Sequence, residues 1–427
     1  MTHAVLVCSA VRIPSPRLLD HPLIDRLSVV TEHGHAARYP EGVAVETVGS
    51  IRDVDEVLAA AWRIAGRYPI DGVLAPYEVG LPAAGYVRTV LGLAGPDLHT
   101  VTLFTNKHVM KQRLSRAGLD LMPFAGAHSD AQVRARAEEF GWPVVVKPAY
   151  GGGSKDVAVV ADAAELDAWL AAGGGLRPDN PTAVVERPAK VLTEYHCDGV
   201  VADGQVRFVV TSCYLEPVLG SIGRGYGTYQ LPPDHPGHLA VAELHATAVA
   251  ALGLRSGVTH LEVFATPDGL RVSEIACRPG GGAIPAAIEL RHGVNMLDAC
   301  VRTSLGLPAF PDSAPAPTHP DARYLGHCGL ALRPGVITEI TSEQELAQLP
   351  GVLRAGLLRG VGDEIAGHIY SASAAGYVHV GADTEQEVRD RLAAVRARYR
   401  IRTRPAGAPT EPRVAESRAA SLQEPSS

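Results

Sequence analysis

The chain has 427 residues, of which 46% are hydrophobic and 20% charged, and a formal net charge of −7 at pH 7. This composition is typical of a globular protein of two to four domains, and the negative charge argues against binding to nucleic acid or an anionic membrane surface. The six cysteines form no CxxC pair, and no apolar run reaches the about 18 residues of a membrane span. We therefore expect reduced thiols, no zinc finger and a cytoplasmic location.

Residues 1–100 alternate strand-like and helix-like segments, which predicts a lobe built on a parallel sheet. Ligands gather beyond the strand ends of such sheets, so Glu78, just after a predicted strand, is a candidate substrate contact. The predicted strands are Val5–Val7, Leu27–Val30 and Ile70–Ala75, and the predicted helices are Val54–Arg67 and Val79–Leu91.

Two helices are predicted next, over Lys107–Gly118 and Ala131–Phe140. Lys107 lies in the first turn, where the positive end of the helix dipole disfavours an ammonium group. This placement favours a functional lysine, with a solvated surface lysine as the alternative.

The segment Val144–Val160 reads VVVKPAYGGGSKDVAVV, two apolar runs around a glycine-rich connection. This pattern predicts two strands joined by a loop, unlike the phosphate loops that enter a helix. Glycine lets the backbone approach an anion closely, and Lys147 can place an ammonium group on a phosphate. The alternative is an ordinary hairpin with a flexible turn.

Further strands are predicted at Ala183–Glu186, before a bend at 187–189, and on both sides of Asp203-Gly204, a type I′ turn signature. Residues 220–236 hold four glycines, two tyrosines and three prolines without hydrophobic periodicity. We interpret them as a substrate-facing loop, in which Arg224 could bind an acidic group. A mobile surface loop is the alternative.

A helix over His238–Leu252 precedes a predicted hairpin, Gly257–Ala265 and Leu270–Ala276. Across this hairpin Glu262 and Glu274 can lie near one another. Two facing carboxylates repel unless a cation lies between them, and hard oxygen ligands suit Mg²⁺. Two separate surface acids are the alternative.

The segment Arg278–Gly282 can bind an anion, because it combines a guanidinium group with three glycines. The rest is predicted to comprise a helix, a proline-rich linker, a small α/β lobe and a disordered tail. These parts are Glu289–Leu305, Pro308–Pro320, Tyr324–Arg400 and residues 403–427.

The order of these features over Val101–Leu305 resembles the ATP-grasp superfamily: lysine, lysine with glycine flap, acidic hinge, two glutamates and arginine. Ala276 stands where the family commonly has a metal-binding asparagine. In this it resembles the amino-acid ligases of the bacilysin-synthesis type, in which an alanine also takes this place. Water or phosphate could complete a second metal ion there. The resemblance implies an α/β ATP-grasp fold. Its expected parts are an N-terminal lobe (1–100), a flap subdomain (101–183), a metal-site subdomain (184–307), a linker (308–322), a C-terminal lobe (323–402) and a tail (403–427).

The resemblance also implies the chemistry: ATP phosphorylates a carboxylate, an amine attacks the acyl phosphate, and ADP and phosphate leave. Small-molecule acids and amines are the expected partners, and a homodimer is left open. A carboxylase or purine-type enzyme and a non-catalytic nucleotide-binding protein are the alternatives. The implied site comprises Lys147 and Arg278 for catalysis; Lys107, Lys147, Gly152, Gly153, Ser154, Glu186, Arg187, Ala189 and Glu194 for ATP; Glu262 and Glu274 for Mg²⁺ or Mn²⁺; and Glu78, Arg224, Tyr226, Gly281 and Gly282 for substrate.

Overall fold

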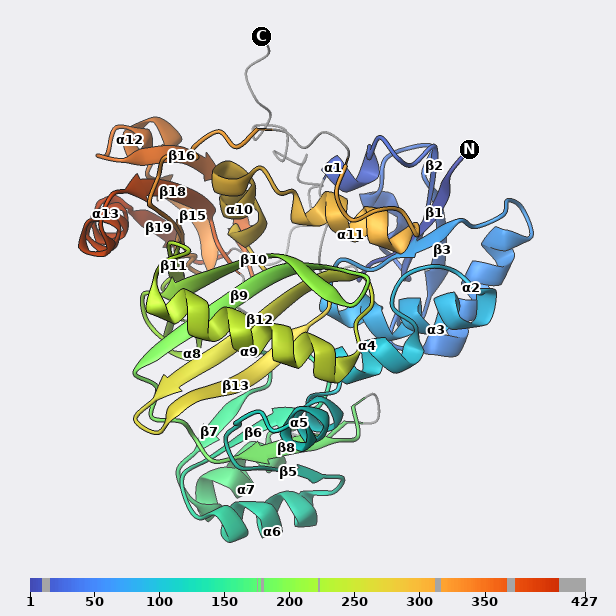
Figure 1. Cartoon of the computed structure of the whole chain (residues 1–427), viewed down its shortest axis with the longest axis horizontal. Coiled ribbons are helices and arrows are strands. Elements are labelled where there is room, and N and C mark those ends of the chain that lie inside the picture. Colours follow the sequence, from blue (N-terminus) through green and yellow to red (C-terminus); the bar gives the residue numbers. More distant parts are fainter. Residues whose placement is uncertain are drawn as a thin grey trace.

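The computed structural model describes residues 1–9, 16–174, 176–177, 180–221, 223–311, 316–366 and 373–406. Figure 1 shows an N-terminal lobe in blue and the C-terminal part in red at opposite ends, with a central sheet in green and yellow between them. A smaller subdomain in teal lies beneath the central sheet in this view. Among the described residues, no helix is long and apolar enough to cross a membrane.

The N-terminal lobe contains a parallel sheet of order β3-β2-β1-β4, as predicted. Its strands β1 and β4 are buried along their whole length, and apart from His3 they contain only apolar residues and glycine. Strand β3 and helix α4 were not predicted. The elements are β1 His3–Val7, β2 Arg26–Glu32, β3 Ala44–Val48, β4 Gly72–Leu74, α1 Pro16–Leu19, α2 Val54–Ala65, α3 Leu81–Leu91, α4 Leu98–Thr105, and the 3₁₀ helices η1 Ala36–Arg38 and η2 Glu78–Gly80.

The teal subdomain carries the predicted hairpin, in which β6 and β7 pair antiparallel with Val144 opposite Val160. Its sheet has the order β5-β8-β6-β7, and the apolar sides of α6 and α7 pack on it. Both predicted helices are confirmed as α5 and α6. The elements are α5 Lys107–Arg116, β5 Phe124–Ala127, α6 Asp130–Phe140, β6 Val144–Pro148, β7 Ala158–Val160, α7 Ala163–Ala171 and β8 Ala183–Glu186.

The central sheet has eight strands in the order β13-β12-β9-β10-β11-β14-β18-β16. Helix α9 lies along one face of this sheet, over β9 and β10 (Figure 1). Asp203 and Gly204 join β9 to β10 with φ angles of 55° and 75°, as a type I′ turn requires. The elements up to β13 are β9 Thr193–Ala202, β10 Gln205–Tyr214, α8 Val218–Ser221, β11 Gly227–Gln230, α9 Pro236–Leu252, β12 Gly257–Thr266 and β13 Gly269–Ala276.

The C-terminal part does not form a separate sheet-and-helix lobe, because three of its strands continue the central sheet. Its remaining strands form a small sheet of order β17-β15-β19. The elements are β14 Tyr324–Gly329, β15 Gly335–Ile340, α12 Glu343–Ala347, β16 Val352–Leu357, β17 Glu364–Ile365, β18 Gly376–Ala382, α13 Glu385–Arg398 and β19 Ile401–Arg404.

Three local predictions were wrong. Residues 220–236 are not one long loop, because 227–230 form the buried strand β11, whose glycine and polar residues hide its strand character. The helix predicted over Glu289–Leu305 is two helices, α10 Ile284–His292 and α11 Met296–Ser304, separated at Gly293 with φ 69°. Residues 403–404 belong to β19, and 407–427 of the predicted tail lie outside the described residues.

Candidate active site

The glycine flap, residues 149–157 between β6 and β7, is anchored at its first residues. The backbone N–H of Lys107 donates to Ala149 O at 2.9 Å, and the amide of Asn180 donates to Tyr150 O at 2.6 Å. Gly153 and Ser154 have φ angles of 70° and 57°, so the loop turns through the left-handed region. The flap therefore leaves the strand with a fixed direction and a tightly turned tip.

The flap backbone lies against charged side chains from two other parts of the chain. A Cβ added to Gly152 would lie 3.5 Å from Glu78 Cγ and 3.8 Å from Arg278 Nη2. Glu78, in η2 beyond β4, accepts from Arg278 Nε at 2.6 Å. The N-terminal lobe, the flap and the end of β13 thus meet at one place, which brings three of the predicted site regions together.

Lys107 connects the flap to the central sheet. Its Nζ lies 3.3 Å from Glu274 Oε2 and also donates to Gly151 O. Burial alone would raise the pKa of Glu274, but the ammonium groups of Lys107 and Lys147 outweigh it and lower that pKa to about 2. Glu274 is therefore an ionised carboxylate at neutral pH.

Two acidic residues face each other on the central sheet, as the hairpin pattern predicts. Glu262 of β12 is the register partner of Glu274 of β13, and both side chains are 24% exposed. Glu194 lies in the neighbouring strand β9, buried, where burial and the charge of Glu262 raise its pKa to about 8. The paired oxygens of Glu262 and Glu274 could hold a hard divalent cation.

The predicted adenine hinge contains a cluster of buried charges. Lys147 Nζ lies 3.1 Å from Glu186 Oε1, and Lys111 Nζ lies 3.2 Å from the same oxygen. Arg187 is exposed and its backbone N–H donates to Pro123 O, while Ala189 is half-buried. Lys111 was missed, because a lysine one turn after Lys107 on a polar helix is indistinguishable in sequence from a solvated one.

A second missed group is a buried hydrogen-bonded row beside Glu262. Asp198 accepts from His196 Nδ1 at 2.7 Å and from His260 Nδ1 at 2.9 Å. His260 Nε2 lies 3.6 Å from Glu262 Oε1. Burial would lower the pKa of His260, but Asp198 and Glu262 raise it to about 10. Because both oxygens of Asp198 accept hydrogen bonds, this row of side chains holds the His260 ring in place beside Glu262.

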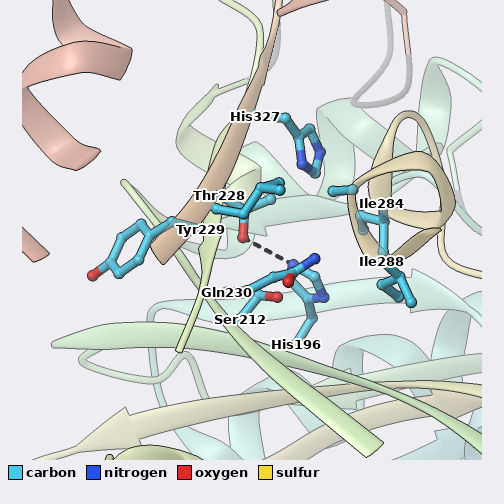
Figure 2. Close-up of a pocket in the computed structure, with 10 residues that line it drawn as sticks. His196, Ser212, Thr228, Tyr229, Gln230, Ile284, Ile288 and His327 are labelled. Atoms are coloured by element: carbon cyan, nitrogen blue, oxygen red, sulfur yellow. Dashed lines mark hydrogen bonds between the residues drawn. The ribbon is translucent and has the colours of Figure 1, made fainter. Parts of the chain in front are cut away.

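The row continues into a small pocket that is lined on one side by α10. Figure 2 shows the hydrogen bond between His196 Nε2 and Thr228 Oγ1, which is 2.9 Å long. Gln230 and His327 line the same pocket, and Ile284 of α10 faces it from the other side (Figure 2). The polar face of the central sheet thus extends from the facing glutamates toward the C-terminal part.

The predicted substrate residues divide into two groups. Tyr226 is buried, and its hydroxyl donates to Gly281 O at 3.3 Å. A Cβ at Gly282 would lie 1.9 Å from that hydroxyl, so only glycine fits beside Tyr226. Arg224 lies apart: its side chain is 68% exposed and pairs with Glu216 at 3.7 Å.

Two family models match the chain. Residues 112–282 match the ATP-grasp domain, and residues 330–404 match the L-amino acid ligase C-terminal domain 2. The first match includes Lys147, Glu262, Glu274 and Arg278, and the second covers most of the C-terminal part that continues the central sheet.

Similar proteins cover nearly the whole chain. An L-arginine-specific L-amino acid ligase of Bacillus subtilis is 28% identical over 87% of this chain and 90% of its own. The crystal structure of an L-amino acid ligase from Bacillus licheniformis superposes with a TM-score of 0.72, at 19% identity, over 95% of this chain and 99% of that one. An ATP complex of carboxyaminoimidazole ribonucleotide synthase from Aspergillus clavatus has a TM-score of 0.66, at 19% identity, over 93% and 99%.

Proposed function

We propose that the chain is an ATP-dependent, ADP-forming ligase of the ATP-grasp superfamily that makes peptide bonds, and that its substrates are amino acids or peptide-like molecules. One of them supplies a carboxylate and the other an amine. The observation that carries the proposal is the meeting of the flap, two lysines, Arg278 and the facing glutamates at one place.

Each charged group has a role in this proposal. Lys107 and Lys147 bind the phosphates of ATP beneath the flap, where Gly152, Gly153 and Ser154 supply backbone and hydroxyl donors. Glu262 and Glu274 hold Mg²⁺ or Mn²⁺, which when bound neutralises charge on the transferring phosphoryl group. The paired carboxylates fit such an ion, because they face each other in register.

The reaction proceeds in two displacements. A carboxylate oxygen of the first substrate attacks the γ-phosphorus, and the bond to the β–γ bridging oxygen breaks to release ADP. The amine of the second substrate then attacks the acyl carbon, loses a proton, and expels inorganic phosphate that carries the original carboxylate oxygen. Arg278 stabilises the charge of the phosphoryl group in both steps, and Glu78 orients its guanidinium through their 2.6 Å hydrogen bond.

The remaining predicted contacts complete the proposal. Glu186, Arg187 and Ala189 line the adenine, and Glu194 binds the ribose hydroxyls. Tyr226, Gly281, Gly282 and Glu78 contact substrate beside Arg278, whereas Arg224 lies apart from this group. All six cysteines are buried free thiols, which supports a cytoplasmic setting.

Isotope transfer tests the reaction class. We expect an ¹⁸O-labelled amino-acid carboxylate, supplied with Mg-ATP and an acceptor amine, to yield labelled inorganic phosphate together with ADP. Mass spectrometry of the products measures both. AMP as the product, or intact ATP across a broad panel of acids and amines, would overturn the proposal. Labelled bicarbonate as the sole acid tests the carboxylase alternative in the same assay.

A second expected result concerns the flap. Residues 150–156 should become protected when the nucleotide binds beneath them, because the loop then gains contacts with phosphate. Hydrogen exchange and limited proteolysis, with and without a non-hydrolysable ATP analogue, measure this protection. Exchange in the surface helix α12 should stay the same. Equal exchange of the flap in both conditions would contradict the proposed phosphate site.

A further inference from the structure

Lys111 is a buried lysine whose ammonium group forms an ion pair with the carboxylate of Glu186. It lies one turn after Lys107 on α5, is 1% exposed, and places its Nζ 3.2 Å from Glu186 Oε1. Its Nζ also lies 5.8 Å from the centre of the Phe124 ring. Because a buried ammonium group is costly unless paired, this arrangement calls for an explanation.

The carboxylate of Glu186 is shared between two lysines. The same Oε1 atom lies 3.1 Å from Lys147 Nζ, and both Glu186 and Lys147 are buried. The two ammonium groups outweigh burial and lower the pKa of Glu186, whereas burial lowers the pKa of Lys111 to about 8. The carboxylate of Glu186 is thus paired with two ammonium groups, so either lysine can move away while the other still neutralises the carboxylate.

Of these two lysines, only Lys147 lies where its side chain could move away from Glu186 toward the flap. Lys147 is the penultimate residue of β6, separated from the flap by one residue, whereas Lys111 is held inside α5, near Phe124 and Glu186. We propose that Lys111 is a positioning residue that keeps Glu186 paired while Lys147 moves from Glu186 to the phosphates of ATP. This inference rests on the proposed role of Lys147 at the phosphates. Its consequence is that Lys111 raises ATP affinity without contacting the nucleotide.

The first test replaces Lys111 by an uncharged side chain of similar length. In Lys111→Met, Glu186 would depend on Lys147 alone, so drawing Lys147 away would leave a buried unpaired carboxylate. We expect the Kd for ATP, measured by calorimetry, to rise at least about tenfold, and the KM for ATP to rise more than kcat falls. Arg116→Met removes an exposed cation from the same helix and should leave both constants unchanged.

A double-mutant cycle separates action through Glu186 from direct contact with ATP. If Lys111 acts through Glu186, its removal should have no further effect once Glu186→Gln has removed the charge. The double variant Lys111→Met with Glu186→Gln should therefore bind ATP as tightly as Glu186→Gln alone. A double variant that binds at least about tenfold more weakly than Glu186→Gln would show direct contact and overturn the inference.

The outcomes distinguish this inference from the proposed function. If the wild type itself does not bind ATP, the proposed function fails. If the wild type binds and Lys111→Met binds equally well, only the inference fails. Should Lys111→Met not fold, the comparison of the double variant with Glu186→Gln decides alone, since those two proteins lack the unpaired buried carboxylate. Lys111→Arg, which retains the charge, should keep an ATP affinity closer to that of the wild type.

Discussion

Glu274→Gln should lower turnover at least about a hundredfold, the scale expected for losing one preorganised electrostatic group. The substitution keeps the shape of the side chain but removes the charge that pairs with Lys107 at 3.3 Å and faces Glu262 across the hairpin. A neutral amide binds a divalent cation more weakly than a carboxylate, so the Mg²⁺ concentration for half-maximal activity should also rise. Phosphate release at saturating ATP, followed over a Mg²⁺ titration, measures both effects.

The matched control is Glu339→Gln, which removes an exposed strand carboxylate that pairs with Arg402 on the surface. Its turnover and metal requirement should equal those of the wild type. Circular dichroism establishes that Glu274→Gln is folded. Near-normal phosphate release by the folded Glu274→Gln protein would contradict the assignment of Glu274 to the metal site.

The sequence was sufficient where the determinants of structure are local. The hairpin that carries Lys147 follows from two β-branched runs around glycines, and its pairing is confirmed. The facing of Glu262 and Glu274 follows from strand alternation and a short turn, and their register is confirmed. The helix predicted over Ala131–Phe140 is confirmed as α6, Asp130–Phe140, with Gly141 as its C-cap.

The sequence was insufficient where a residue acquires its role from distant partners. Lys111 is a core residue only because Glu186, far along the chain, lies beside it. Strand β11 is buried between β10 and β14, yet its residues Gly227–Gln230 lack an apolar pattern. A polar strand of this kind is stabilised by neighbouring strands rather than by its own propensity, so no local signal marks it.

The buried row behind Glu262 joins strands that are far apart in sequence. Asp198 lies in β9 and His260 in β12, where the two are register partners. Gly280 packs directly on this pair, since a Cβ added there would lie 2.7 Å from Asp198 Oδ1. The row therefore supports Glu262 on one side and the segment after Arg278 on the other, which links the stability of the sheet to the geometry of the site.

Asp198→Asn should lower the free energy of unfolding by about 3–5 kcal/mol, the cost of removing one partner from a buried charge pair. Asp198 is 0% exposed, and its carboxylate accepts from His196 and His260. An amide offers one acceptor oxygen in place of two, so one imidazole loses its partner, and the charge on His260 retains only Glu262 as a counter-ion. Urea denaturation followed by circular dichroism measures the loss. The control Asp234→Asn breaks an exposed ion pair with Arg323 and should leave the free energy of unfolding nearly unchanged. Equal stability losses in the two variants would show that Asp198 does not support the central sheet in this way.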